Sequence, residues 1–353
     1  MDYDLTLFLV PDYYSSFSCK CGDCRQSCCE GWDVAISQKE YYDLLSLDAS
    51  DELRSRLSRA FYIPRDAEPE RYAFLNHDWL GNCPLRDSTG LCLLHSQAGE
   101  ESLPGVCRLY PRSIRKDLCE ATLSNSCERV IEMLAERTTQ LKFIQQRIGA
   151  EGTGFEPPYR MSLRMQCIGI LQDRNSSLAQ SFESVGELIT GQKAQKREFE
   201  DCLGVMMSFC REYSENGSSI AEYCEQSIRT LNGISGNEYN KRRILMHSMF
   251  PNLEMIQENL MVNHLFYEKF PYSESREDET EEYESLCAVL CFIGVLVNGN
   301  LERISRTEDL VDLLSKAFRV MEHSAFHYND HVLLDRAGFG EPEIAGSLLE
   351  FSL

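Results

Sequence analysis

Cysteine is concentrated in the first third of this chain. Ten of the sixteen cysteines lie within residues 19–127, and five of these fall within residues 19–29. Thiols at such density need a chemical reason, and two reasons are common: disulfide bonds, or a metal ion or iron–sulfur centre bound by thiolates. A site with four thiolate ligands would require two or more of these loops to converge, so this feature constrains the fold most.

Whether the thiols form disulfide bonds or bind metal depends on how reducing their cellular compartment is. The first fourteen residues contain two early aspartates and no basic segment, so we expect no secretory signal. The longest apolar run, Cys287–Val297, is about half as long as a bilayer span requires. We therefore expect a cytoplasmic protein outside the membrane, in which thiols stay reduced and bind metal rather than form disulfides.

The net charge of the chain is strongly negative. Lysine and arginine number 35 against 56 aspartates and glutamates, which gives −21 at pH 7. Such a surface repels phosphates, so we expect no nucleic-acid partner. It weakly favours a lysine-rich partner, although a charge that merely keeps the protein soluble is the simpler explanation.

Residue patterns divide the 353 residues into two regions. Residues 1–128 hold most of the cysteines together with glycines and prolines that interrupt long helices, and we interpret them as an irregular metal-binding region. Within it, helices are predicted over 38–47 and 50–60, where Ser50 and Asp51 can cap the second. Residues 129–353 read as a helical bundle, so the predicted fold class is mainly α. The predicted helical stretches are 127–147, 160–190, 194–213, 219–231, 252–269, 280–298 and 307–325.

The context of the thiols favours ligand loops. Cys83 precedes Pro84, Cys92 follows Gly90 by two residues, and such neighbours fix the backbone while leaving room for a metal or its sulfides. The spacing matches neither a zinc ribbon with paired Cys-x2-Cys motifs nor a Cys-x3-Cys-x2-Cys triad. Cys28 and Cys29 are adjacent and can serve different roles.

Other thiols have a simpler explanation. Cys21 and Cys119 are as compatible with small buried side chains as with ligands. Cys287 and Cys291 share one face of an apolar run and are expected in the core, and the same holds for the other cysteines beyond residue 128.

The cysteine motifs resemble those of the flagellin lysine-N-methylase family, whose N-terminal part is similar to small zinc- or iron-chelating cysteine-cluster domains. The matching motifs are Phe17-Ser18-Cys19, Cys24, Cys28-Cys29, Gly31-Trp32, Cys83-Pro84-Leu85, Gly90-Leu91-Cys92, Gly99-Glu100, Leu103, Cys107, Tyr110-Pro111-Arg112, Glu120, Cys127-Glu128, Glu258-Asn259-Leu260, Asn263 and Phe270-Pro271. They span most of the chain, and those near the N-terminus are the more specific. The proline that follows the last cysteine motif in the family is absent after Cys127.

The resemblance implies an enzyme that transfers a methyl group from S-adenosylmethionine to lysine ε-amines of flagellin. It also implies a [4Fe–4S] cluster, with zinc as the alternative metal. The candidate ligands are Cys19, Cys24, Cys28, Cys29, Cys83, Cys92, Cys107 and Cys127. Eight candidates exceed the four ligands of one cluster, and the sequence does not choose among them.

Methyl transfer to lysine requires a neutral amine, so the site has to desolvate the lysine or supply a base. Asp78 and Tyr110 lie beside the cysteine loops and are the candidate catalytic residues, although a turn aspartate and a packing tyrosine are the simpler explanations. Arg108 and Arg112 are candidates for binding a carboxylate or phosphate of the cofactor, or for salt bridges in an acidic protein.

S-adenosylmethionine would have to bind in an unusual way. The chain lacks the glycine-rich loop that follows a strand in Rossmann-type methyltransferases. Either an open iron of the cluster holds the methionine amine and carboxylate, or the metal is purely structural.

Three histidines, His323, His327 and His331, recur at intervals of four residues near the end of a predicted helix. Such spacing can chelate a metal, but a polar helix face explains it more simply. Asn329-Asp330 can end the helix before the third histidine.

Three readings of the whole chain follow. It is a metal-dependent lysine methylase, a cysteine-cluster metal-binding or redox protein without methylase activity, or a helical scaffold whose metal only holds the N-terminal fold.

Overall fold

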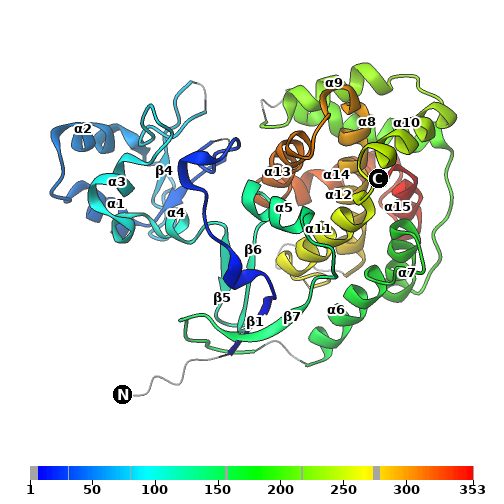
Figure 1. Ribbon diagram of the computed structural model, residues 1–353, viewed down its shortest axis with the longest axis horizontal. Coiled ribbons are helices and arrows are strands. Elements are labelled where there is room, and N and C mark those ends of the chain that lie inside the picture. Colours follow the sequence, from blue (N-terminus) through cyan, green and yellow to red (C-terminus); the bar gives the residue numbers. More distant parts are fainter. Residues whose placement is uncertain are drawn as a thin grey trace. The chain divides into compact units, whose positions relative to one another are not determined.

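The computed structural model describes residues 7–30, 32–79, 81–155, 158–215, 218–272 and 279–352. Backbone contacts divide the chain into two compact units: unit 1 comprises residues 1–17 and 113–353, and unit 2 comprises residues 18–112. The predicted mainly α fold is confirmed, because helices dominate unit 1 and flank the short strands of unit 2 (Figure 1). Contacts group residues 113–128 with the helical unit, whereas the cysteine distribution groups them with the cysteine-rich region.

Unit 2 combines short helices with a three-stranded sheet in the order β2-β4-β3. Its described elements are η2 (Cys21–Asp23), β2 (Ala35–Ile36), α1 (Gln38–Leu45), α2 (Asp51–Ala60), β3 (Phe61–Tyr62), β4 (Ala73–Leu75), α3 (Leu93–Ala98), η3 (Glu100–Ser102) and α4 (Gly105–Leu109). The two predicted helices of this region are confirmed. Ser37 forms a capping box with Glu40 at the start of α1, and Ser50 caps α2 by accepting from Leu53 N.

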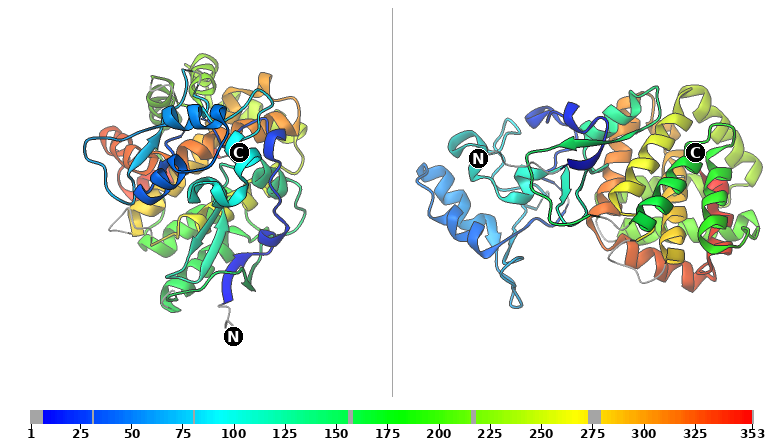
Figure 2. Two further views of the ribbon diagram at one scale, coloured as in Figure 1. Left: turned by 90° about the vertical axis from the view of Figure 1, so that its left-hand side faces the viewer. Right: turned by 90° about the horizontal axis from the view of Figure 1, so that it is seen from below.

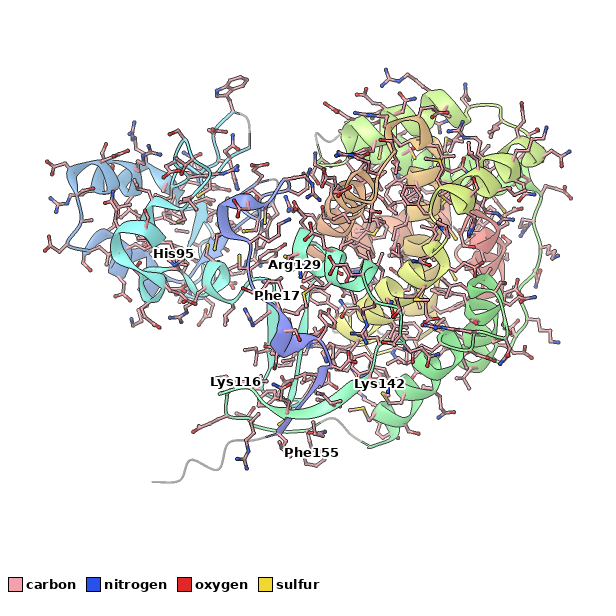
Figure 3. All side chains as sticks on the ribbon, in the orientation of Figure 1. Phe17, His95, Lys116, Arg129, Lys142 and Phe155 are labelled. Atoms are coloured by element: carbon pink, nitrogen blue, oxygen red, sulfur yellow. The ribbon has the colours of Figure 1, made fainter. Side chains whose placement is uncertain are left out.

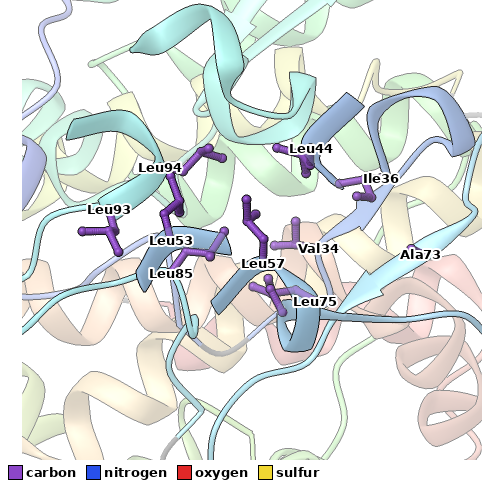
Figure 4. Packing of buried hydrophobic residues seen from close by; sticks show 11 residues of the cluster. Val34, Ile36, Leu44, Leu53, Leu57, Ala73, Leu75, Leu85, Leu93 and Leu94 are labelled. Carbon is purple, nitrogen blue, oxygen red and sulfur yellow. The ribbon is translucent and has the colours of Figure 1, made fainter. Parts of the chain in front are cut away.

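One apolar cluster forms the core of unit 2. Leu53 and Leu57 of α2 belong to it together with Ile36 and Leu75 of the sheet and Leu94 of α3 (Figure 4). Two cysteines pack against this cluster, namely Cys83 and Cys92. The core therefore supports the loops that carry these thiols.

Unit 1 also contains a four-stranded sheet in the order β5-β6-β1-β7. Its strands are β1 (Leu7–Pro11), β5 (Arg112–Arg115), β6 (Glu120–Leu123) and β7 (Phe143–Arg147). β1 pairs in parallel with β6 and antiparallel with β7. Figure 3 shows Lys116 in the turn between β5 and β6, and Lys142 directly before β7.

Helices form the rest of unit 1, which appears as one helical body in both views of Figure 2. The described elements are η1 (Tyr14–Ser16), α5 (Glu128–Ala135), α6 (Pro158–Leu171), α7 (Leu178–Thr190), α8 (Phe199–Glu215), α9 (Ala221–Leu231), α10 (Gly236–Met249), α11 (Leu253–Tyr267), α12 (Glu279–Gly299), η4 (Leu301–Arg303), α13 (Thr307–His323), α14 (Phe326–Ala337), α15 (Pro342–Ala345) and η5 (Gly346–Phe351). α12 is the central element, since α7, α8, α9, α10, α13, α14, α15 and η5 all contact it.

By length and composition α12 could cross a membrane, and among the helices of the described segments it is the one that passes this test. Its apolar window is entirely buried inside unit 1. Cys287 and Cys291 lie on this helix and are fully buried, as expected for core residues. These properties are those of a core helix.

Four sequence predictions of secondary structure were wrong or incomplete. Residues 127–147 form a helix only up to Ala135, because 143–147 pair with β1 as a strand. The three histidines do not share one helix: α13 ends at His323, and α14 begins at Phe326 and carries the other two. Asn329-Asp330 lies inside α14 rather than ending a helix. The helix α10 was not predicted, because its apolar residues follow no clear period.

Candidate functional site

Most candidate thiols lie in unit 2. Seven of the eight predicted ligands belong to residues 18–112, whereas Cys127 belongs to unit 1, where it occupies the N-cap position of α5. No disulfide bond joins the cysteines of the described segments.

Backbone pairing brings three cysteine segments of unit 2 together. Cys83 N donates to Cys29 O over 2.9 Å, and Glu30 and Asn82 form an antiparallel bridge beside it. A second bridge joins Arg86 to Cys92 across a turn closed by Asp87. Segments 28–30, 82–86 and 91–93 therefore lie side by side.

Gly90 makes the turn between Cys83 and Cys92 possible. Its φ of 87° lies in the left-handed region, where a Cβ is unfavourable. Asp87 stabilises the turn because its Oδ1 accepts from the backbone N–H groups of Thr89 and Leu91 over 2.8 and 3.1 Å. A turn therefore separates these two thiols.

Cys29 is the thiol of this group whose pKa is lowered. Hydrogen bonds from the thiols of Cys28 and Cys83 hold the pKa of Cys29 well below its ordinary value, and the charge of Arg86 contributes. Arg86 is held in place by an ion pair with Glu30. Cys29 is therefore the thiol of this group that most readily carries negative charge, as a metal ligand must.

The remaining thiols of the group resist ionisation while Cys29 carries the charge. Local desolvation of the thiol, then the charges of Cys29 and Cys92, raise the pKa of Cys107, although the residue as a whole is exposed. Burial and then the charge of Cys29 raise the pKa of Cys92. The pKa of Cys83 is also raised, chiefly by its hydrogen bond to Cys29. These thiols therefore lie close enough to influence one another's ionisation.

α4 carries Cys107 toward this group and is fixed at its start by a carboxylate. Glu40 Oε1 accepts a hydrogen bond of 2.7 Å from Gly105 N, while its Oε2 caps α1. The same glutamate therefore joins α1 to the segment that contains Cys107.

The residue types of this group suit a thiolate-bound centre. Their side chains, however, are not arranged as the ligands of one metal ion. In the parts of the chain that the structure describes, no group of three or more His, Cys, Asp or Glu side chains is placed to hold one metal ion. The mutually coupled thiols are Cys28, Cys29, Cys83, Cys92 and Cys107. Cys19 instead accepts from Cys21 N over 3.3 Å at the exposed surface, and Cys24 is half-buried.

The predicted catalytic and cofactor residues have structural partners. Asp78 accepts from Asn82 N over 2.9 Å and so closes the loop before Cys83. The Tyr110 ring lies 5.6 Å from that of Trp32. Arg108 pairs with the exposed Glu101, and Arg112 begins β5. Their functional roles stay predictions.

Unit 1 contains a second group of polar side chains that contact one another, and of its members the sequence had singled out only His323 and His327. It joins the loop after β6 to α11, α12, α13 and α14, and its members are Ser124, Ser126, His264, Glu268, Ser285, Glu322, His323, His327 and Asp330. His264 Nδ1 lies 3.0 Å from Glu322 Oε1. Ser126 Oγ lies 2.8 Å from His323 Nε2.

The charges in this network are perturbed by burial. Burial lowers the pKa of His323, although the nearby Glu322 opposes it. Burial raises the pKa of Glu268, but His327 and His264 outweigh it and the pKa is lowered on balance. The sequence signal for this network was polar residues within apolar helices, such as His264 in α11 and Ser285 in α12.

Curated proteins with names that refer to lysine methylation are similar to this chain. The lysine-N-methylases of Salmonella typhimurium and Salmonella choleraesuis are each 23% identical to it over 175 residues, which is 47% of this chain and 43% of each relative. The flagellar biosynthetic protein FliU of Salmonella muenchen is 27% identical over 125 residues, which is 34% of this chain and 72% of that protein. The chain thus spans less than half the length of the two lysine-N-methylases.

No family model matches the chain. No solved structure matches it either. The resemblance to lysine-N-methylases that the motifs indicate is therefore confirmed as sequence similarity over about half of the chain.

Proposed function

We propose that this chain is a cytoplasmic S-adenosylmethionine-dependent protein lysine N-methyltransferase that acts on flagellin and binds a [4Fe–4S] cluster. The similarity to two lysine-N-methylases carries this proposal, and the similarity to a flagellar biosynthetic protein supports the substrate. The exposed surface of such an acidic chain suits lysine-rich substrate segments.

The thiols coupled to Cys29 are the proposed cluster ligands: Cys29, Cys83, Cys92 and Cys107. Cys28 is left as a hydrogen-bond donor to Cys29 because neighbouring residues rarely bind the same centre. A bound cluster would supply an iron atom able to hold the amine and carboxylate of a methionine group.

The chain has to perform the remaining chemistry. The lysine amine attacks the methyl carbon, a C–N bond forms, and the C–S bond breaks with its electron pair going to sulfur. The sulfonium becomes a neutral thioether, and the proton lost by the lysine goes to a base of the protein. Asp78 and Tyr110 stay candidates for that base.

A second function remains open, a cysteine-cluster zinc or iron protein without methylase activity. The two sheets in the described segments have four and three strands, and neither is the doubly wound parallel sheet that binds S-adenosylmethionine in Rossmann-type enzymes. This observation favours the alternative, and it makes a direct assay necessary.

Incubation of the anaerobically purified protein with S-adenosylmethionine and flagellin tests the function. We expect flagellin to gain mass in steps of one methyl group, at lysines identified by peptide mass spectrometry. A protein that retains its metal but adds no methyl group to flagellin would show the alternative to be correct.

Metal analysis of Cys29→Ser tests the ligand assignment. We expect loss of the bound iron, because the thiolate that anchors the group is removed. Cys21→Ser is the matched control, since Cys21 lies in the same segment, is exposed and interacts with Cys19 instead. Equal iron in both variants would contradict the assignment, and zinc in place of iron would support the alternative function.

A further inference from the structure

We propose that Trp79 binds the protein substrate, and that its indole ring together with the neighbouring Asp78 carboxylate receives a lysine side chain of that substrate. The identity of the substrate as flagellin rests on the proposed function. The binding site itself is inferred from the geometry and charge of the Trp79 loop, which comprises residues 76–79, 81 and 82 of unit 2.

Asp78 closes the backbone of the Trp79 loop. Asp78 N donates to Asn82 O over 2.9 Å, and Gly81 N donates to Asp78 O over 2.9 Å. Asp78 Oδ1 also accepts from Asn82 N over 2.9 Å. The φ of Gly81 is 81°, a left-handed conformation that glycine adopts readily. Trp79 therefore lies at the tip of a tight turn whose conformation is held by three hydrogen bonds.

Both ends of the Trp79 loop are fixed to the rest of unit 2. Asn76 N donates to the last carbonyl of α2 over 2.7 Å. At the other end, Asn82 forms an antiparallel bridge with Glu30, and Cys83 N donates to Cys29 O over 2.9 Å. The loop therefore projects from the segments that carry the proposed cluster ligands.

The ring of Trp79 is held in water. Trp79 is 90% exposed, the largest exposed fraction among the large apolar residues that the structure describes. Trp32, by contrast, donates from Nε1 to Cys28 O and lies against the ring of Tyr110. Tryptophan is usually well buried, and it is enriched among the residues that dominate protein–protein binding. A ring already fixed in its exposed position loses little conformational freedom when a partner covers it.

The charges near the ring favour a cationic partner. Residues 76–82 contain one carboxylate, that of Asp78, and no lysine or arginine. Residues 18–112 as a whole contain 15 acidic and 11 basic residues. An ammonium group is attracted to the face of an indole ring and to a neighbouring carboxylate, while the methylene stem of lysine covers apolar surface. A lysine side chain therefore matches both parts of the site.

The position of the loop in the chain connects it with the proposed chemistry. Cys83, a proposed cluster ligand, directly follows Asn82, and Asp78 is a candidate base. A lysine bound at Trp79 is thus held on the segment that carries both residues.

Tryptophan fluorescence of the intact, cluster-loaded protein tests whether flagellin covers Trp79. The chain has two tryptophans, so the difference between wild type and Trp79→Phe isolates the emission of Trp79. We expect flagellin monomers to shift this emission to shorter wavelength and to protect it from quenching by acrylamide. A Trp79 ring that stays as accessible with saturating flagellin as without it overturns the proposal.

Chemically modified flagellin tests the recognition of lysine. Acetylation removes the positive charge of the lysine side chains, whereas reductive dimethylation keeps it. We expect dimethylated flagellin to protect Trp79 from acrylamide, and acetylated flagellin to give no protection. Equal protection by the two forms would show that the ring does not recognise a lysine cation.

Steady-state kinetics test the contribution of the ring to substrate binding. Trp79→Ala is expected to raise KM for flagellin about tenfold with kcat unchanged, because it removes a binding contact and leaves the reacting groups in place. Trp79→Phe retains an aromatic face and is expected to lose less. Tyr62→Ala is the matched control, since Tyr62 is another exposed aromatic residue of unit 2, and its KM is expected to equal that of wild type.

Circular dichroism verifies that each variant is folded. An unchanged KM in Trp79→Ala, or an equal rise in Tyr62→Ala, overturns the proposal. Protection of Trp79 when the protein is concentrated without flagellin would identify self-association, and it too would overturn the assignment of the ring to the substrate.

Failure of the proposed function gives a different result. Flagellin that protects Trp79 but gains no methyl group would refute the methyltransferase and retain the binding site. Methylation of flagellin with the wild-type KM in Trp79→Ala would refute the binding site and retain the function.

Discussion

Asn263 Nδ2 donates a hydrogen bond of 2.8 Å to Asn125 Oδ1, although the two residues are 138 positions apart in the chain. The same amide donates to Leu123 O over 2.8 Å, and its oxygen accepts from Tyr13 over 2.8 Å. Asn125 in turn donates to Leu260 O. Two motifs of the family resemblance, around Cys127 and around Asn263, therefore meet inside unit 1.

Asn263→Leu is expected to destabilise unit 1 by about 1–3 kcal/mol, because it leaves the buried partners of the amide unsatisfied. Urea unfolding followed by circular dichroism measures this change. Asn240→Ala is the control, since Asn240 is exposed on α10 and contacts Arg243 only at the surface. Equal stability of both variants would show that the hydrogen bonds around Asn263 do not contribute to the stability of unit 1.

Glu120→Ala should destabilise the protein by about 3–5 kcal/mol, since it removes the partner of two buried guanidinium groups. Glu120 is fully buried between Arg115 and Arg164, and both form ion pairs with it. The control Glu225→Ala breaks an exposed pair with Arg229 and is expected to cost less than about 1 kcal/mol. Thermal unfolding of both variants compares the two losses of stability. A similar loss in each would show that the buried ion pairs contribute no more than the exposed one.

Asp309 gives a pH-dependent contribution at the start of α13. Hydrogen bonds from the side chain of Arg306 lower the pKa of Asp309 to about 2, and the backbone of Ser305 and Arg306 adds to this effect. The folded pKa is below the unfolded value of about 3.9. The stabilisation is therefore present above about pH 4 and is lost as the pH falls toward 2.

We expect Asp309→Ala to lose about 1 kcal/mol at pH 7 and progressively less as the pH drops below 4. Urea titrations at a series of pH values measure the difference from wild type. Glu308→Gln, at the exposed neighbouring position, is the control. A difference that stays constant down to pH 2 would contradict the assigned role of the ionised carboxylate.

Two helical glycines should respond in opposite directions to alanine. A Cβ on Gly294 of α12 would lie 1.8 Å from Phe351 O, so Gly294→Ala is expected to cost at least about 2 kcal/mol. A Cβ on Gly204 of α8 meets no atom within 4 Å. Gly204→Ala is therefore expected to stabilise by about 0.5–1 kcal/mol, and thermal unfolding that ranked the two variants the other way would contradict this packing.

Local patterns were sufficient for many of the helices. The caps at Ser37 and Ser50 and the apolar runs of α11, α12 and α13 identify these helices because capping and helical periodicity act within a few residues. The strand β7 was missed because its partner β1 lies more than a hundred residues away. A strand of five residues gains its stability from that distant pairing rather than from its own sequence.

The sequence by itself determined that this protein is mainly helical, acidic and rich in thiols near its N-terminus, because composition and short-range periodicity are properties of the chain. Tertiary structure alone decided which of those thiols lie near Cys29, and that Ser285 of α12 contacts His327 and Asp330 of α14. Contacts between distant segments depend on how the helices and loops pack, and no local pattern encodes their final spacing.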